Sequence, residues 1–144
     1  MLTDSQKKLI DRWHHGLEKR DVEDLVQLFA PHPRIRNAAD PPLEGPDAPR
    51  RLLTAFMEHI QACRFTLLDA ASGEGQLFAG SRFELTLPAG LQIADMKLPR
   101  PITVNMRAFE RFRLDAQGRI EQLDIVHETT SVFQAAQAAV QERR

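Results

Sequence analysis

The sequence predicts an α+β fold in which N-terminal helices pack against a largely antiparallel sheet. Over the first third of the chain, apolar residues recur every three or four positions, as they do on one face of a helix. From Arg64 onward they alternate with polar residues, which is the spacing of strands. Helices followed by a run of consecutive strands indicate an α+β protein.

Length and composition narrow the classes of protein that fit. At 144 residues the chain has the size of one domain, and we expect residues 1–144 to form a single domain. The 19 basic and 20 acidic residues nearly balance, which argues against binding to nucleic acid or a membrane surface. A single cysteine, Cys63, excludes an internal disulfide and fits a reducing compartment. We see no signal peptide and no membrane-spanning run, and therefore expect a cytoplasmic protein.

Helices dominate the first 61 residues. The first begins with a capping-box pattern at Thr3 and Gln6 and carries an apolar face that includes Trp13. Asp21 can cap a second helix over 22–30, which Pro31 and Pro33 are expected to close. The remaining elements of this half are a short strand over 34–38, a proline-rich loop over 39–49 and a third helix over about 47–61.

The second half reads as strands and one last helix. The expected strands cover 64–70, 76–87, 101–114 and 119–127, and the helix covers 131–141. The turns "ASGEG" and "DAQG" suit hairpins. The segment over 88–100 makes an unusually long connection between the middle strands, and we interpret it as a flap.

The register of the last hairpin decides which side chains share a face of the sheet. A type I turn that continues into a bulge at Gly118 sets Arg107 opposite His127 and Glu110 opposite Asp124. His127 then points inward and Asp124 points away. A two-residue turn would shift the register by one residue and exchange His127 for Asp124. The other expected pairs are Phe109 with Ile125, Arg111 with Leu123, Ala108 with Val126, and Leu114 with Ile120.

This register leaves both faces of the sheet partly apolar. A sheet of that kind needs a cover on each side. The helices can cover one face, and a second copy of the chain could cover the other. We therefore expect a homodimer formed through the sheet.

At this point the chain resembles a known family. Helices, then "RIRNAADPPLEGPDA", then strands ending in "GRIEQLDIVHETTSVFQ", are similar to the SnoaL-like proteins of the nuclear transport factor 2-like fold. The resemblance implies a strongly curved, mixed or antiparallel sheet that wraps the N-terminal helices into a cone with a deep apolar pocket. That family includes polyketide cyclases, ketosteroid isomerase, limonene epoxide hydrolase, scytalone dehydratase and binding modules without catalysis, so it implies the fold more firmly than the reaction.

Two patches resemble limonene epoxide hydrolase in particular. Asn37 follows the first strand just before the proline-rich loop, and Arg82 with Glu84 matches an Arg-x-Asp pair on a middle strand. The resemblance implies that Arg82 and Glu84 face the pocket. Two other positions depart from the pattern, because Ile35 replaces a water-binding Tyr and Ile125 replaces a second catalytic Asp.

The candidate catalytic residues follow from these readings. His127 is the candidate for proton transfer, since imidazole titrates near neutral pH. Arg82 would stabilise an oxyanion, and Glu84 would orient Arg82. Asp124 takes the place of His127 if the register slips. Each has a structural alternative: a solvated strand face for the pair and a hydrogen-bonded structural histidine for His127. The substrate-binding candidates are Trp13, Asn37, Arg107, Phe109, Leu123 and Ile125.

The function we expect is that of a cofactor-independent enzyme using general acid/base catalysis in an apolar pocket. Isomerase, cyclase, dehydratase and epoxide hydrolase chemistry share this logic. The substrate would be a small apolar molecule that carries an oxygen function. No metal-ligand, phosphate-loop or dinucleotide motif occurs, so no metal or cofactor is expected. The alternative is a small-ligand-binding module of the same fold that catalyses nothing.

Overall fold

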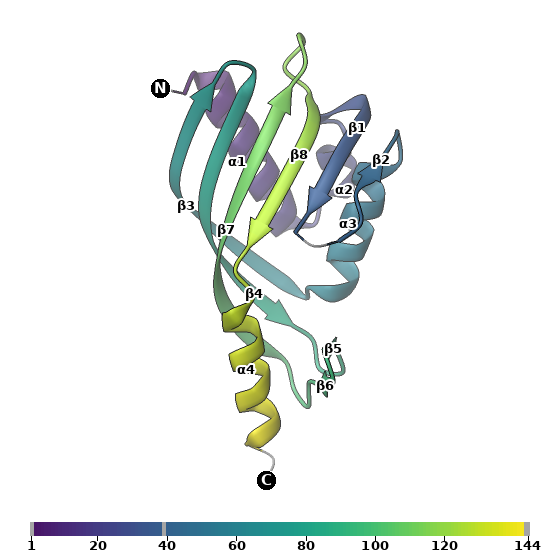
Figure 1. Cartoon of the computed structure of the whole chain (residues 1–144), viewed down its shortest axis with the longest axis vertical. Coiled ribbons are helices and arrows are strands. Elements are labelled where there is room, and N and C mark those ends of the chain that lie inside the picture. The colour runs from purple at the N-terminus through teal and green to yellow at the C-terminus, as the bar shows by residue number, and fades with distance from the viewer. Residues whose placement is uncertain (1, 39, 143–144) are drawn as a thin grey trace.

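A bent sheet with helices on its concave side forms the body of the molecule. The structure, a computed structural model, describes residues 2–38 and 40–142. The helices are α1 (Asp4–Lys19), α2 (Val22–Val26), α3 (Ala48–His59) and α4 (Thr130–Gln141). The strands are β1 (Phe29–Asn37), β2 (Leu43–Glu44), β3 (Ala62–Gly73), β4 (Gln76–Leu87), β5 (Gln92–Ile93), β6 (Met96–Lys97), β7 (Ile102–Leu114) and β8 (Ile120–His127). Figure 1 shows α1, α2 and α3 behind the sheet and α4 at its lower end.

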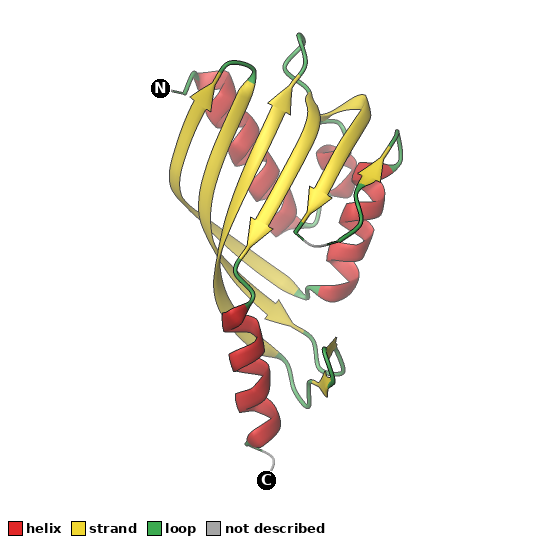
Figure 2. Cartoon of the chain, viewed as in Figure 1, coloured by secondary structure: helices red, strands yellow, loops and turns green. Residues whose placement is uncertain are grey.

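The large sheet is mixed and strongly curved. Its strand order is β2-β1-β8-β7-β4-β3, and β1 runs parallel to β8 while every other neighbouring pair is antiparallel. The long strands β3, β4 and β7 bend as they pass below the helices (Figure 2). This architecture confirms the predicted α+β class with N-terminal helices held inside a curved sheet.

The start of α1 forms as its sequence predicts. The Thr3 side chain accepts a hydrogen bond from the backbone N–H of Gln6, and the Gln6 side chain accepts one from the backbone N–H of Thr3. This capping box satisfies two N–H groups that the first turn leaves without helical partners. The helix is therefore fixed at its start, and its position along the sheet places Trp13 and His14 over the strands.

The prediction was wrong for the segment after α2. The helix expected over 22–30 ends at Val26, and strand β1 already begins at Phe29 and contains both prolines. The pairing of β1 with β8 shifts between Phe29 and Arg34, so Pro31 and Pro33 lie in an irregular stretch. There the missing proline N–H groups cost no ladder hydrogen bond, which is why two prolines are tolerated in the strand.

The expected register of the last hairpin was correct only next to the turn. Leu114 pairs with Ile120 as predicted, but the register then shifts by one residue, so that Ala108 faces His127 and Glu110 faces Ile125. The extra residue is Glu121, which lies in a bulge that no glycine or proline marks. The corrected pairs are Phe109 with Val126, Arg111 with Asp124, and Phe112 with Leu123.

With this register the two faces of the sheet differ in composition. We call the face toward α1 and α3 the inner face and the opposite face the outer face. On β7 the inner face carries Ile102, Val104, Met106, Ala108, Glu110 and Phe112, all of them buried. The outer face carries Arg107 and Phe109, which are exposed.

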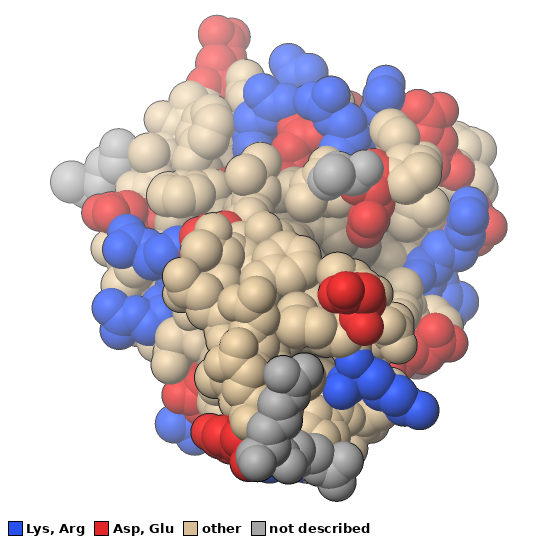
Figure 3. Space-filling model, turned by 60° about the horizontal axis from the view of Figure 1, so that its bottom comes forward, with Lys and Arg blue, Asp and Glu red and all other residues tan. Residues whose placement is uncertain are grey.

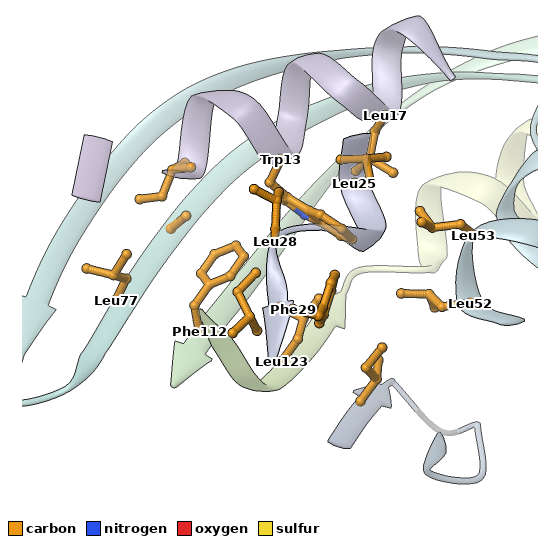
Figure 4. Close-up of a cluster of buried hydrophobic side chains, with 14 of the residues drawn as sticks. Trp13, Leu17, Leu25, Leu28, Phe29, Leu52, Leu53, Leu77, Phe112 and Leu123 are labelled. Atoms are coloured by element: carbon orange, nitrogen blue, oxygen red, sulfur yellow. The ribbon is translucent and has the colours of Figure 1, made fainter. Parts of the chain in front are cut away.

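Two clusters of apolar side chains fill the concave side. One joins α1, α2 and α3 to the upper strands; in Figure 4, Trp13 points from α1 toward Phe112 and Leu123. The Trp13 ring meets the Phe112 ring edge-on, with the centroids 6.5 Å apart. The second cluster lies lower, where α4 packs on β7. Glu110 lies on β7 between the two clusters, at the point where the core gives way to a cavity.

Candidate functional site

A cavity opens between α1, α3 and the inner face of the sheet. Its volume is about 710 Å³, and the β5–β6 hairpin and α4 contribute to its walls at the lower end of the molecule. This volume lies within the range of small-molecule sites. The walls are mainly leucine, isoleucine, phenylalanine, methionine and valine side chains. The polar residues that line it are Asn37, Asp40, Arg51, His59, Glu110, His127 and Thr129.

Glu110 is the buried carboxyl group of this cavity. It is 3% exposed, and both of its oxygens have partners on helix α1. Trp13 Nε1–H donates a hydrogen bond to Oε2 at 2.6 Å, and His14 Nε2 lies 2.6 Å from Oε1. Burying a carboxyl group is costly unless such partners compensate. Two consecutive helix residues therefore hold one carboxyl group at the inner end of the cavity.

Aromatic rings fix the position of His14. Its ring stacks on Phe65 with the centroids 4.7 Å apart and meets Phe83 edge-on at 6.2 Å. His14 itself is 6% exposed. The imidazole therefore has little freedom to turn away, and its Nε2 stays directed at Glu110.

The His14–Glu110 contact shares one proton between two titratable groups. Either the imidazole Nε2–H donates to the carboxylate, or the protonated carboxyl donates to the imidazole nitrogen. Each carboxylate oxygen has two lone pairs, so Glu110 can keep both contacts to α1 and still accept a proton from a molecule in the cavity. This arrangement suits a general base or acid.

Two more polar side chains lie next to Glu110 on the inner face. Ile125 is opposite Glu110 on one side and opposite Asn37 on the other, and His127 follows two residues later on the same strand. Glu110, Asn37 and His127 therefore surround Ile125, and all four line the cavity. His127 Nδ1 is buried and has no hydrogen-bond partner among the described residues. Because Nδ1 is fully buried, a bound molecule would reach it only if the ring turned.

Arg82 and Glu84 lie on the outer face of the sheet, away from the cavity. Both side chains are exposed on the outer face of β4, while Phe83 and Leu85 point inward and line the cavity. The expectation that Arg82 and Glu84 face the pocket was therefore wrong. The physical reason is strand parity: the inner face takes Ser81, Phe83 and Leu85, so the residues between them point out.

The other predicted residues divide between the two faces. Trp13, Asn37, Ile125 and His127 line the cavity, as expected. Arg107 and Phe109 do not, because the bulge at Glu121 leaves them on the outer face, where Phe109 is 59% exposed. Leu123 is fully buried in the upper core cluster and does not reach the cavity.

Asp124 points away from the cavity, into a network on the outer face. It accepts hydrogen bonds from Arg36 Nε at 2.9 Å and Arg111 Nε at 2.8 Å. Partial burial raises the pKa of Asp124. The hydrogen bonds from Arg36, Arg111 and Gln122 together lower it by more than burial raises it, so the pKa falls below its ordinary value. Asp124 is therefore held as a carboxylate by its arginine partners and joins β1, β8 and β7.

The sequence analysis missed Glu110 and His14. It assigned Glu110 to the face that points away and did not single out His14. One signal was available: the alternating set Ile102, Val104, Met106, Ala108, Glu110 and Phe112 contains a single charged residue. A lone carboxylate in an otherwise apolar alternation is a candidate for a functional buried group.

Three further observations bear on the chemistry. Burial raises the pKa of the Cys63 thiol to about 11, with Glu18 adding to the rise and Arg20 opposing it, so this cysteine is a poor nucleophile. The described residues contain no cluster of three or more metal-ligating side chains. Among the described helices, none has the length and apolar character needed to cross a membrane.

Comparison with known proteins identifies the relationship. The sequence profile of the SnoaL-like domain family matches residues 10–123. No curated protein gives a significant match to the sequence. Many solved structures share the fold.

Three solved structures illustrate the range. One, from Shewanella denitrificans OS-217, is provisionally classed as a SnoaL-like polyketide cyclase; it is 14% identical, covers 94% of this chain and 99% of its own, and superposes with a TM-score of 0.80. SalBIII, an epoxide hydrolase/cyclase-like enzyme of pyran ring formation in salinomycin, is 17% identical with coverages of 90% and 97% and a TM-score of 0.69. A hypothetical protein of Catenulispora acidiphila DSM 44928 with a ketosteroid isomerase-like fold, in complex with trimethylamine, is 14% identical with coverages of 90% and 92% and a TM-score of 0.70. At these identities the likeness shows the fold alone.

Proposed function

The chain belongs to the SnoaL-like domain family, and on that premise we propose that it is a cofactor-independent enzyme that moves a proton on a small apolar carbonyl compound. The observation that carries the proposal is Glu110, a carboxyl group that is 3% exposed and lines an apolar cavity of about 710 Å³. If packing were the only role of this position, an apolar residue would fill it at a lower desolvation cost. The neighbours named as a polyketide cyclase and as an epoxide hydrolase/cyclase-like enzyme support an enzyme that acts on small molecules.

In the proposed mechanism Glu110 acts as the general base. It removes a proton from the carbon next to the carbonyl group; the electron pair of that C–H bond forms a C=C bond, and the π pair of the C=O bond moves to the oxygen to give an enolate. Glu110, now protonated, returns the proton to carbon at the same or another position. A single group that takes and returns the proton is sufficient for isomerisation, and the enolate carbon can instead attack a second carbonyl in a cyclisation.

We assign the stabilisation of the enolate oxygen to Asn37 and His127. The Asn37 side-chain amide carries two N–H donors, and the imidazole ring of His127, which also lines the cavity, carries an N–H donor. Two donors directed at a developing negative charge inside an apolar cavity lower the barrier more than they would in water.

Trp13 and His14 act on Glu110 as positioning residues. They bind both of its oxygens at 2.6 Å and so fix the direction in which the free lone pairs point. The orientation matters because proton transfer needs the acceptor within about 2.6–3.2 Å of its partner, directly or through one water.

The test uses 2-tetralone, an apolar ketone whose C1 protons exchange readily with solvent. We expect the protein to accelerate hydrogen–deuterium exchange at C1 in D₂O, followed by NMR. Glu110→Gln preserves the shape of the side chain but cannot take the proton, and should slow the catalysed exchange by about 10²–10⁴-fold. The matched control is Glu84→Gln, which makes the same change on the exposed outer face and should leave the rate unchanged.

Two results would contradict the proposal. Equal exchange rates for Glu110→Gln and the unchanged protein would remove Glu110 from the mechanism. Binding of 2-tetralone without any catalysed exchange would favour the second candidate, a binding module without catalysis. The mainly apolar cavity wall favours that candidate as well, and Glu110→Gln would then alter affinity but no rate.

We also propose that two copies associate through the outer face. Phe109 and Val126 form a cross-strand pair there and are 59% and 61% exposed, and Phe78 on β4 is 43% exposed. Apolar side chains grouped on one face mark an interaction surface more often than scattered ones do. Sedimentation velocity should show a dimer that Phe109→Asp converts to a monomer. A monomeric unchanged protein would contradict this.

A further inference from the structure

The open end of the cavity differs chemically from its inner end. We use "rim" for the cavity-lining residues that are also exposed, among which the polar ones are Asp40, Arg51, His59 and Thr129. Figure 3 shows the lower end of the molecule, where uncharged residues form much of the surface and charged side chains gather mainly toward the edge. The rim is therefore the place where a polar group of a bound molecule would meet the protein.

Helix α3 places two nitrogen-bearing side chains on this rim. Arg51, Ala55 and His59 follow one another at intervals of four residues and all line the cavity. Residues at this interval form one stripe along a helix. The small Ala55 separates the guanidinium from the imidazole and leaves space between them.

Arg51 has no ionic partner within the described part of the chain. Its neighbour Arg50 binds the carboxylate of Glu23 through two nitrogens, at 2.7 and 3.2 Å. Arg36 and Arg111 both donate to the carboxylate of Asp124. No hydrogen bond or ion pair joins the side chain of Arg51 to another described residue, even though Asp40 lies on the same rim. A guanidinium at the mouth of an apolar cavity is thus left available for a ligand.

The hydrogen bond within α3 fixes the orientation of His59. Its Nδ1 lies 2.7 Å from the carbonyl oxygen of Ala55, which can only accept, so Nδ1 carries the proton. The other nitrogen, Nε2, is left for the rim. It donates a hydrogen bond whenever the ring is protonated, which an anionic ligand would favour.

We propose that the rim binds the carboxylate of an amphiphilic substrate whose apolar body fills the cavity. This rests on the proposed function and assigns its substrate class, an apolar keto acid. Arg51 would hold the carboxylate through two parallel N–H···O bonds, the geometry in which a guanidinium matches it, and His59 would add a third donor. With its charge held at the rim, the carboxylate stays away from Glu110, so the two negative groups do not oppose each other.

The test separates the head group from the apolar body. The assay would measure how well decanoate, 1-decanol and decylammonium, which share a chain and differ in charge, displace the fluorescent probe N-phenyl-1-naphthylamine. We expect decanoate to bind best. Arg51→Gln should weaken the affinity for decanoate by about 5- to 10-fold, as loss of a charge-assisted pair predicts, and leave the affinity for 1-decanol unchanged. Arg50→Gln is the matched control and should change neither.

Four results would overturn the proposal. In Arg51→Gln, the affinity for decanoate and 1-decanol could fall equally, or neither affinity could fall. The unchanged protein could prefer decylammonium, through Asp40, or could fail to bind the probe. A decanoate preference that disappears in Arg51→Gln while 2-tetralone exchange is absent supports the rim and refutes the catalytic proposal. Catalysed exchange without a decanoate preference refutes the rim alone.

Discussion

Glu84 and Glu110 have the same side chain on adjacent strands of one sheet, yet they lie in opposite environments. Glu84 is exposed on the outer face, and no hydrogen bond or ion pair links its side chain to another described residue. Glu110 is buried on the inner face, and Trp13 and His14 bind both of its oxygens. The difference arises from which face of its strand each residue occupies, because neighbouring strand residues point to opposite sides. Burial with matched partners is what turns a carboxyl group into a candidate for chemistry.

The inner and outer faces also differ in what they contribute to stability. The inner face of β7 is buried along its length, whereas the outer face exposes large apolar and charged side chains side by side. Substitutions placed in pairs, one on each face, therefore test the comparison directly.

The largest expected difference in stability is between two phenylalanines on β7. Phe112 is fully buried against Trp13, so Phe112→Ala should lower the free energy of unfolding by about 3–5 kcal/mol. Phe109→Ala should lower it by less than about 1 kcal/mol. The measurement is urea unfolding at a protein concentration where sedimentation shows a monomer. Similar losses for both variants would mean that the two faces are not distinct.

The next difference is between two adjacent histidines on α1. His14→Leu removes a partner of the buried Glu110 and should lower the free energy of unfolding by about 1–3 kcal/mol. The side chain of His15 is 63% exposed, so His15→Leu should change it by no more than about 0.5 kcal/mol. Urea unfolding of both variants at neutral pH makes the comparison. An unchanged free energy of unfolding in His14→Leu would show that the contact to Glu110 contributes little to stability.

A third pair compares thiols on β3. Cys63 has a pKa of about 11 because it is partly buried, and at pH 8 very little of it is thiolate. In a Cys63→Ala background, Thr66→Cys places an exposed thiol on the outer face, with an ordinary pKa of about 8.5. Iodoacetamide should modify the outer thiol about ten- to a hundredfold faster at pH 8. The rate for Cys63 should continue to rise toward pH 11, and a plateau near pH 9 would contradict the assignment.

The smallest expected effect is in the outer-face network of Asp124. Its pKa is below the ordinary value in the folded chain, so its contribution to stability is present above the ordinary pKa, near pH 4, and is lost as the pH falls through the lower folded pKa. Asp124→Asn should lower the free energy of unfolding at pH 7 by less than about 1 kcal/mol, because the arginine partners are partly exposed. It should also flatten the acid limb of the stability profile measured by urea unfolding between pH 2 and 7. An unchanged acid limb would remove Asp124 from that role.

Local patterns were enough to predict most of the architecture. The α1 capping box, the strand alternation from β4 onward and the order of helices before strands all appear as expected. Each depends on residues close together in the sequence, where propensity and periodicity carry the information. The first half of β1 was missed, because Pro31 and Pro33 are tolerated only through the irregular pairing with β8, a contact distant in sequence.

The candidate site was predicted only in part. His127, Asn37, Ile125 and Trp13 reach the cavity as expected. The bulge at Glu121 shifts β7 by one residue relative to β8, and no turn residue in the sequence marks it. The shift moves the side chains of β7 to the faces opposite to those expected, so it hid Glu110 and misplaced Arg107 and Phe109. Arg82 and Glu84 were misplaced for another reason, because the parity of β4 sets Phe83 and Leu85 inward.

The most direct test of the central claim is a crystal structure of the protein with 2-naphthol, a stable analogue of the enol of 2-tetralone. The account predicts that the rings occupy the cavity and that the hydroxyl oxygen lies about 2.6–3.2 Å from a donor of Asn37 or His127. Carbon 1 should face the carboxyl group of Glu110. Naphthol bound on the outer face, or in the cavity with Glu110 out of reach of the ring, would contradict the claim that Glu110 moves the proton.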